Sequence, residues 1–517
     1  MPGEDTVAVP RGEGDRGAEP DGSVWRYARA ERASVIVDAE DYFLHMQEAM
    51  LAANRRIFLI GWDFDTRIHL MHGRKWWQRP FRRHTHPLRL GSFIGWLPRH
   101  RPNLDIRILK WRVSFLQMLA RGTMFWDVAR WARHKRITFK FDNAHPIACS
   151  HHQKIAVLDD RLAVCGGIDM TDKRWDTREH REDDPRRRGV NRRQYTPWHD
   201  ATMMMEGEVA AALAELGHAR WERAGGGDLP EIEASTESLW PEKLPVQFEN
   251  VEVGIARTRA KFRDCEEVNE IEALYVRQIR AAKRFIYAES QYFASRAVAE
   301  AITARLQEPD PPEIVIVHPA NADGWLEQQA MDHSRAALVR AIDEADPEDR
   351  FSLWMPYTGE TPIYCHAKLM IIDGTILRIG SANLNNRSMG LDSECDVFVD
   401  ADRPGNDHAA NPIAALRCSL LAEHLGLREE DMSQLLDRYP SMREMIENEG
   451  TAQGRHLKRY RPPELTEAQR KLAESQLLDP ERPDDMFEPF AKGGLFRQGS
   501  RLARMRARLH WRKRGQQ

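Results

Sequence analysis

The sequence has few cysteines and no long hydrophobic run, and each absence narrows the class of protein. The 517 residues include six cysteines and no Cys-x-x-Cys pair, which favours a reduced, cytosolic-type protein with buried thiols. Since no run of about 18 apolar residues occurs, no transmembrane helix is expected. The first 24 residues are rich in glycine, proline and acidic side chains and lack the apolar segment of a secretory signal. We therefore expect a disordered leader and a cytoplasmic protein.

An excess of charge of one sign is also missing. The net charge is −3, so bulk electrostatics gives no support for binding nucleic acid. Apolar residues make up 42% and charged residues 30% of the chain, which is typical of a soluble globular protein. A chain of 517 residues exceeds the usual size of one compact core, and this length predicts two domains or two large lobes.

The chain does contain one internal repeat. Residues 41–56 and 266–284 both carry apolar residues at helical spacing, and each segment is followed by a short apolar run, at 57–65 and 285–293. Further apolar strands are predicted in both copies, at 105–111, 161–169, 313–319 and 375–383. Helices that alternate with short strands indicate an α/β fold, and two copies predict two similar lobes packed face to face.

Changes in composition along the chain predict five segments. We expect a disordered leader at 1–24, a first lobe at 25–225, a linker at 226–245, a second lobe at 246–425 and a helical, basic extension at 426–517. The linker is placed by its glycine, proline and serine residues, which punctuate the pattern between the two copies of the repeat.

Three charged segments allow more than one interpretation. Residues 73–87 combine two tryptophans and a phenylalanine with basic side chains, and contact with a membrane surface is slightly favoured over an ordinary surface loop. The basic end, residues 496–517, fits a membrane-surface helix and a solvated tail equally well. Residues 177–195 are predicted to form part of an active-site rim or to be disordered.

Each copy of the repeat carries a His-x-Lys-(x)4-Asp motif. The six motif residues are His152, Lys154, Asp159, His366, Lys368 and Asp373. Because strand residues two apart point to the same face, the histidine and lysine of each motif are expected to project together. One such motif is weak evidence, since many strands carry His-x-Lys by chance, whereas two copies at the same spacing are specific.

Two histidine–lysine pairs suit the cleavage of a phosphodiester. Lysine ammonium groups can stabilise the anionic oxygens of the transition state. One imidazole can attack phosphorus and form a phosphohistidine, while the other protonates the leaving oxygen and later activates water or an alcohol. The lysines supply the positive charge that a metal would otherwise give, so neither a metal nor another cofactor is expected.

Each imidazole also needs an acceptor on its other ring nitrogen, to fix the tautomer and the orientation of the ring. The sequence offers Asp200 in the stretch PWHD and Glu394 in the stretch LDSE, which follow the first and the second motif. Either residue could instead be an ordinary surface carboxylate.

These motifs and their surroundings resemble the phospholipase D superfamily. Residues 151–221, with HHQKIAVLDD and PWHD, and residues 286–293, IYAESQYF, are similar to plant and animal phospholipases D. Residues 363–394 resemble the second motif of these enzymes with its trailing Gly-Ser-x-Asn. The resemblance extends over roughly residues 30–400 and implies two α/β/α-sandwich lobes with one active site at their interface.

The resemblance also implies a role for each site residue. His152 would be the nucleophile and His366 the general acid and base, while Asp200 and Glu394 would orient the two imidazoles. The two motif aspartates would steady the turns of their motifs. The residues expected to hold phosphate oxygens or to lie close to the substrate are Lys154, Gly167, Asp169, Lys368, Ser381 and Asn383.

Departures from the family pattern leave the substrate open. No calcium-dependent lipid-binding domain fits before residue 30, so calcium dependence is not expected, and the segment after Arg387 is as short as in bacterial cardiolipin synthases. The leading hypothesis is a monomeric phospholipase D that contacts a membrane surface transiently, acts on glycerophospholipids by hydrolysis or transphosphatidylation, and releases phosphatidic acid. The alternatives are a cardiolipin synthase-type phosphatidyltransferase, then a nuclease of the same superfamily, then a lipid-binding scaffold without activity. No nucleic-acid partner is expected.

Overall fold

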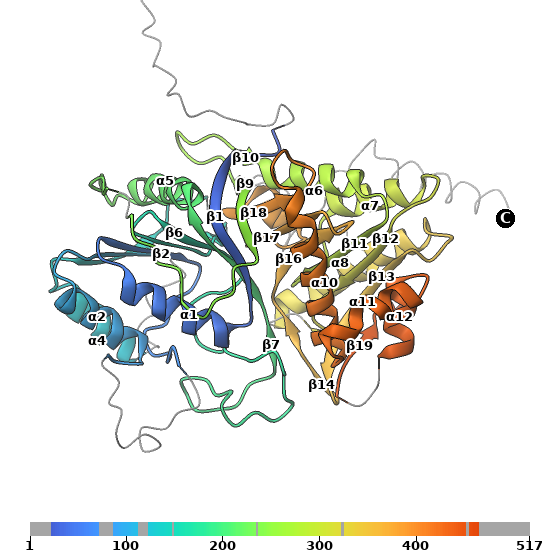
Figure 1. The fold of residues 1–517 in the computed structure, drawn as a ribbon, viewed down its shortest axis with the longest axis horizontal. Helices are drawn as coiled ribbons and strands as arrows, with labels where there is room; N and C mark the ends of the chain where they lie inside the picture. Colours follow the sequence, from blue (N-terminus) through green and yellow to red (C-terminus); the bar gives the residue numbers. More distant parts are fainter. Residues whose placement is uncertain are drawn as a thin grey trace, which may run out of the picture.

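One continuous β-sheet runs through both halves of the sequence (Figure 1). The computed structural model describes residues 22–71, 86–111, 122–146, 149–233, 236–321, 325–450 and 454–464, with the backbone alone for 325–331. Most of the predicted leader, most of the tryptophan-containing segment 73–87 and the basic end of the chain lie outside the described residues.

The first half contributes strands in the order β4-β3-β2-β5-β6-β8-β1. Their bounds are β1 Arg26–Val37, β2 Arg56–Gly61, β3 Asp105–Trp111, β4 Ile137–Asp142, β5 Ile155–Leu158, β6 Leu162–Gly166 and β8 Ala201–Gly207. The strands β2, β3 and β4 are parallel, and the other neighbours are antiparallel. Ile57 and Leu59 belong to one core cluster and Phe58 and Ile60 to another, so alternate residues of β2 are buried on opposite faces.

The second half has the same strand order, β13-β12-β11-β16-β17-β18-β9, with the same parallel and antiparallel neighbours. The bounds are β9 Phe248–Arg259, β11 Phe285–Ser290, β12 Glu313–Val317, β13 Phe351–Thr358, β16 Lys368–Ile372, β17 Ile376–Gly380 and β18 Glu394–Asp400. The long strands β1 and β9 pair antiparallel from Arg26 opposite Ile255 to Ala33 opposite Phe248, and this ladder joins the two halves.

Helices cover both faces of each half (Figure 1). In the first half these are α1 Ala39–Ala52, α2 Leu90–His100 and α4 Thr123–Trp131 on one face and α5 Glu208–Arg223 on the other. In the second half they are α6 Glu270–Ala281, α7 Arg296–Leu306 and α8 Trp325–Asp343 on one face, and α10 Ala410–Leu425, α11 Glu429–Arg438 and α12 Met442–Glu449 on the other. The predicted α/β class is confirmed.

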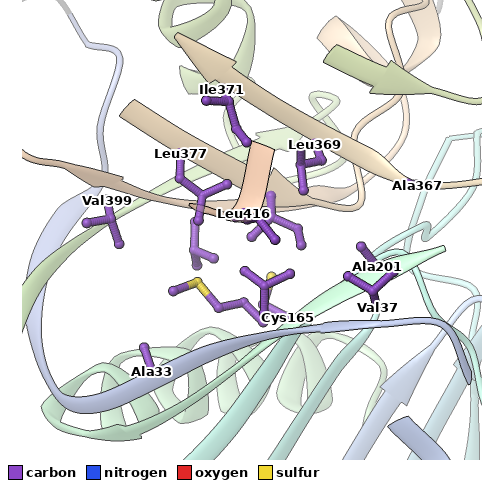
Figure 2. Packing of buried hydrophobic residues seen from close by; sticks show 14 of the residues in the cluster. Ala33, Val37, Cys165, Ala201, Ala367, Leu369, Ile371, Leu377, Val399 and Leu416 are labelled. Atoms are coloured by element: carbon purple, nitrogen blue, oxygen red, sulfur yellow. The ribbon is translucent and has the colours of Figure 1, made fainter. Parts of the chain in front are cut away.

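The two halves share one hydrophobic core. Cys165 of β6 and Ala201 of β8 face Leu369 of β16 and Leu377 of β17 across this core, with Leu416 of α10 between them (Figure 2). All five side chains are buried. Burying apolar surface from both halves at once stabilises their relative position. The strand ends that follow the two motifs are thereby fixed against each other.

The C-terminal extension differs in part from the expected all-helical segment. The helices α11 and α12 agree with the prediction, but Arg455–Arg459 forms β19, which pairs antiparallel with β13. The exposed edge of β13 offers unpaired backbone groups, and a short segment can satisfy them whatever its side chains are. The stretch RHLKR has one apolar residue and therefore no strand periodicity to detect.

The charged segment 177–195 is also better ordered than one of its two predictions allowed. The side chains of His180, Asp184 and Arg187 are buried, so the prediction of disorder is wrong for them. Their charges are paired inside the protein, as in the contact of 3.1 Å between Arg187 and Asp176. Across the described ranges, no helix has both the length and the apolar character needed to cross a bilayer.

Candidate active site

The backbones of the two histidine motifs are held by the opposite halves of the protein. The N–H of His152 donates to the carbonyl of Ser393 over 2.9 Å, and the N–H of His366 donates to the carbonyl of His199 over 2.7 Å. The sequence predicts both histidines inside strands, but β5 and β16 begin just after them. The difference arises because the backbone there pairs with the other half, in one case through the short parallel strands β7 Trp198–His199 and β15 Tyr364–Cys365.

Ser393 and His199 each directly precede a carboxylate. The two carboxylates are exchanged between the halves, in the sense that each contacts the histidine of the opposite half. The Nδ1 of His152 lies 3.1 Å from both carboxylate oxygens of Glu394, and the Nδ1 of His366 lies 2.7 Å from Asp200 Oδ2. With Nδ1 held by a carboxylate, Nε2 is the nitrogen that can react with a substrate. The orienting residues expected from the sequence are therefore in contact with the histidines, each with the histidine of the other motif.

Both motif lysines are buried beside the histidines. Lys154 Nζ donates to the carbonyl of His152 over 2.8 Å and lies 3.3 Å from Asp169 Oδ2. Lys368 Nζ donates to the carbonyl of His366, and to Gln291 Oε1 over 3.2 Å. Two ammonium groups at one site provide a place for the anionic oxygens of a phosphodiester.

Burial and these lysines set the protonation of the imidazoles. Burial, with Lys154 and Lys368, holds the pKa of His152 well below its usual value. Burial, with Lys368 and Arg174, does the same to the pKa of His366. Burial also lowers the pKa of Lys368 itself to about 7. A lowered imidazole pKa keeps the ring neutral near pH 7, and the neutral ring is the nucleophilic form.

The two carboxylates have different surroundings. Glu394 accepts hydrogen bonds from Ser381 Oγ at 2.5 Å and from Ser388 Oγ at 2.7 Å, and burial raises its pKa to about 8. Asp200 accepts from the backbone N–H of Ala201 at 2.8 Å, and burial raises its pKa as well. Ser381 was expected near the phosphate, and the structure places its hydroxyl on Glu394.

Gly167, directly after β6, and Gly380, the last residue of β17, allow neighbouring side chains to approach the strand ends closely. A Cβ atom on Gly167 would lie 2.0 Å from Asp200 Oδ1, and one on Gly380 would lie 2.1 Å from Asp396 Oδ1. Only a residue without a side chain fits at such distances. Gly167, which was expected near the substrate, thus makes room for the carboxylate that orients His366.

Asp169 and Asn383 each lie three residues after a strand end, Asp169 after β6 and Asn383 after β17. Asp169 Oδ1 accepts from the backbone N–H of Asp63 over 3.3 Å, and its other oxygen faces Lys154. The side-chain oxygen of Asn383 is buried and has no hydrogen-bond partner among the described residues. A buried amide oxygen of this kind is costly unless a ligand or water pairs with it, which fits a group that contacts the substrate.

The two motif aspartates lie away from the imidazoles and bind backbone instead. Asp159 accepts from the N–H groups of Asn54, Arg55 and Arg56 at 2.7–2.8 Å, at the start of β2. Asp373 accepts in the same way from residues 283–285, at the start of β11, at 2.7–2.9 Å. Both aspartates therefore hold the turn after their motif strand against the neighbouring strand.

Aromatic side chains that sequence reasoning missed flank both histidines. The ring of Trp62 lies edge-on to His152 with centroids 6.3 Å apart and stacks on Trp111 at 5.8 Å. Trp198 stacks on Tyr364 at 4.5 Å, and its ring centroid lies 5.1 Å from that of His366. Their positions give a usable signal, since Trp62 directly follows β2 and Tyr364 is two residues before His366 on a short strand.

Comparison with known proteins agrees with this geometry. A family model described as a cardiolipin synthase, phospholipase D-like domain matches residues 275–413. Phospholipase D A from Dictyostelium discoideum is 23% identical over 501 residues, which cover 78% of this chain and 36% of the relative. Phospholipase D alpha 2 from Arabidopsis thaliana is 24% identical over 423 residues, which cover 58% of this chain and 51% of the relative.

The chain thus spans between 36% and 51% of the length of these two relatives. Among solved structures, a phosphatidylserine synthase from Haemophilus influenzae has a similar fold, with a TM-score of 0.54 at 11% identity, covering 83% of this chain and 97% of that one. The sequence matches, the shared fold and the paired motifs lead to one assignment. These findings support the phospholipase D superfamily as the family of this chain.

Proposed function

We propose that the chain is a phospholipase D that cleaves the headgroup phosphodiester of glycerophospholipids by double displacement through a phosphohistidine. The observation that carries this proposal is the exchanged pairing of His152 with Glu394 and of His366 with Asp200, beside two buried lysines. Two oriented imidazoles at one anion-binding site are what a two-step displacement at phosphorus needs.

In the first step, Nε2 of His152 attacks phosphorus and the bond from phosphorus to the headgroup oxygen breaks. His366 donates its Nε2 proton to that oxygen, so the headgroup leaves as a neutral alcohol. Burial, with the charge of Lys368, lowers the pKa of His366. A bound anionic phosphodiester offsets the lysine charge, so substrate binding favours the protonated acid.

In the second step, His366 takes a proton from water, whose oxygen attacks phosphorus while the bond to His152 breaks. The products are phosphatidic acid and the free enzyme. If a primary alcohol replaces water, the same step gives a phosphatidylalcohol. Lys154 and Lys368 stabilise the phosphate oxygens in both steps, and one chain supplies both motifs, so the reaction needs no second copy.

Glycerophospholipid substrates are supported by the relatives named as phospholipases D and by the aromatic pairs beside the histidines. Such rings offer apolar surface with a polar edge, which suits a lipid headgroup region at a membrane surface. A phosphatidyltransferase is the second candidate, because the matching family model is described as cardiolipin synthase and the structural relative is a phosphatidylserine synthase.

Incubating the purified chain with vesicles of labelled phosphatidylcholine, phosphatidylethanolamine or phosphatidylglycerol, each with and without a primary alcohol, tests the proposal. We expect phosphatidic acid without the alcohol, phosphatidylalcohol with it, and neither product from His152→Ala. Conversion of phosphatidylglycerol to cardiolipin as the main product would favour the transferase. If no lipid is consumed while plasmid DNA is cleaved in a His152-dependent way, the lipid proposal is wrong.

A further inference from the structure

A second cluster of histidines and carboxylates lies directly behind the active site. Its members are all buried, come from distant parts of the chain and take no part in the proposed reaction. They are Asp38, Asp176, His180, His199, Glu289 and Glu423.

Four of these side chains converge on one point. His180 Nε2 lies 2.9 Å from Glu423 Oε1 and 3.4 Å from Asp38 Oδ2. His199 Nδ1 lies 2.8 Å from the same oxygen of Glu423 and 3.5 Å from Asp38 Oδ1. Ligand atoms about 2.0–2.1 Å from a tetrahedral zinc ion lie about 3.3–3.4 Å from one another, so the cluster has the size of such a site.

One carboxylate oxygen of this cluster supports a cation at its centre. Asp38 Oδ2 is buried and accepts no hydrogen bond from the described residues. A buried carboxylate oxygen without a partner is costly, and the nearest group to it across the cluster is His180 Nε2 at 3.4 Å. A cation between Asp38, Glu423 and the two imidazoles would satisfy this oxygen.

The outer nitrogens of both imidazoles are held as they are in metal sites. His180 Nδ1 lies 3.1 Å from Asp176 Oδ2, and His199 Nε2 lies 2.8 Å from Glu289 Oε2. Arg187 in turn binds Asp176 at 3.1 Å. Histidines that bind metals usually donate their other N–H to a carboxylate in this way, which fixes the ring for coordination.

The count of protons gives an independent argument. All four ring nitrogens of His180 and His199 lie 2.8–3.1 Å from a carboxylate oxygen, so each of these contacts needs a proton or a cation between its two partners. If both rings carried two protons, two buried imidazolium ions would lie with ring centroids 5.6 Å apart. One divalent cation replaces the two inner protons at the same total charge and leaves both rings neutral.

We propose that Asp38, His180, His199 and Glu423 bind one divalent cation, and that this cation is zinc. Two imidazole nitrogens and two carboxylate oxygens at this spacing fit zinc better than magnesium or calcium, which prefer six or more oxygen ligands. The proposed role of the cation is structural, because none of its four ligands takes part in the proposed reaction.

The cation site and the active site share backbone contacts. Asp38 Oδ1 accepts from the N–H of Asp200 over 3.1 Å, and the N–H of Asp38 donates to the carbonyl of Asp200 over 2.8 Å. The carbonyl of His199 accepts from the N–H of His366. Bound zinc would thus fix Asp38 and His199, and through their backbone contacts it would position the Asp200–His366 pair.

Metal analysis of the tag-free full chain tests this proposal. After zinc addition and dialysis, we expect about one zinc per chain, at least about tenfold less in His180→Gln and Glu423→Gln, and an unchanged amount in His408→Gln, whose ring is on the surface. Zinc added to chelator-stripped protein should raise the midpoint of thermal unfolding by about 5 °C or more.

The proposal can be tested even if the variants fail to fold, because the unmodified chain gives a separate readout. Cobalt bound to the stripped protein should show the intense visible absorption of a tetrahedral site. Zinc below about one-tenth equivalent, without a thermal shift or cobalt spectrum, would mean that protons fill the cluster, and equal zinc in His180→Gln would place the metal elsewhere. Either result overturns the proposal, and neither depends on phospholipase activity.

Discussion

The two histidine–carboxylate pairs of the active site are built alike but hold their imidazoles differently. His366 Nδ1 lies 2.7 Å from one oxygen of Asp200, whereas His152 Nδ1 is shared between the two oxygens of Glu394 at 3.1 Å and the carbonyl of Ser381 at 3.0 Å. The side chain of His152 is 14% exposed and that of His366 is 7% exposed. The difference supports a division of labour in which the more accessible ring attacks phosphorus and the more firmly held ring transfers protons.

Removing each imidazole in turn gives the largest expected effect. His152→Ala and His366→Ala should each lower kcat for phosphatidylcholine by about 10⁴-fold or more, because each ring is needed in both steps. The two variants should differ with a phosphodiester whose leaving group is a good one, such as phosphatidyl-p-nitrophenol. His366→Ala should then accumulate the phosphoenzyme, since the departure of the leaving group no longer needs an acid. His152→Ala should form no phosphoenzyme.

Mass spectrometry of base-quenched protein detects this phosphoenzyme. Thermal unfolding of both variants serves as the folding control. A phosphoenzyme that survives in His152→Ala and is lost in His366→Ala would reverse the assigned roles and break the comparison.

Neutralising the two carboxylates should give the next largest effect, and an unequal one. Asp200→Asn should lower kcat by about 10²–10⁴-fold, because an amide can hold His366 in the wrong tautomer. The loss of kcat in Glu394→Gln should be about tenfold smaller than that in Asp200→Asn, because the carbonyl of Ser381 still accepts from His152 Nδ1. Steady-state kinetics with one lipid measures both, and exposed Asp402→Asn is the matched control. Equal losses, or a larger loss in Glu394→Gln, would remove the basis for the comparison.

The pH dependence of KM should report the lysine beside the second histidine. A lysine is charged below its pKa, and burial lowers the pKa of Lys368 to about 7, so its charge is lost as the pH rises through this value. KM should therefore rise about fivefold between about pH 7 and pH 8, while kcat changes less because bound phosphate favours the charged form.

The variant Lys368→Arg sharpens this test, because arginine keeps its charge over the whole range. Initial rates measured across the same pH values should give a KM that no longer rises. A KM that is flat in the unmodified chain, or that rises equally in Lys368→Arg, would show that another group controls binding.

The motif aspartates should give the smallest effect on activity. Asp159→Asn and Asp373→Asn each weaken a carboxylate that binds three backbone N–H groups, so the free energy of unfolding should fall by about 1–3 kcal/mol. Asp159 is buried and Asp373 is half-buried, so Asp159→Asn should lower the free energy of unfolding by more than Asp373→Asn. Denaturant titration measures the loss, and kcat per folded molecule should stay nearly unchanged. A large fall in kcat without a loss of stability would give these residues a chemical role.

Much of this arrangement could be predicted from the sequence because it follows from local periodicity. The spacing of two between His152 and Lys154, and between His366 and Lys368, already implies side chains on one face. The helical stripe of residues 41–56 is also correct, since Phe43 and Met46 are buried in α1. The α/β class follows from the alternation of such segments.

The exchange of Asp200 and Glu394 could not be predicted, because it depends on the backbone pairing of residues far apart in the chain. The ladder between β1 and β9, which joins the halves, has the same origin. The buried cluster around His180 is hidden for another reason. Its members come from distant parts of the chain, and His180 itself lies in a highly charged stretch that is expected to be solvent-exposed unless the partners of its charges are known. The strand β19 forms at an available sheet edge and not from its own sequence pattern.

The exchanged carboxylates make catalysis a late event in folding. His152 and Glu394 are 242 residues apart in the sequence, and His366 and Asp200 are 166 apart, so neither pair forms until the two halves dock. Contacts between such distant residues are slow to form, whereas helices and local strand pairs form early. During refolding, the far-ultraviolet signal should therefore recover before enzymatic activity does. A half-folded chain would hold intact motifs but no oriented imidazole, and so could not carry out the proposed reaction before assembly is complete.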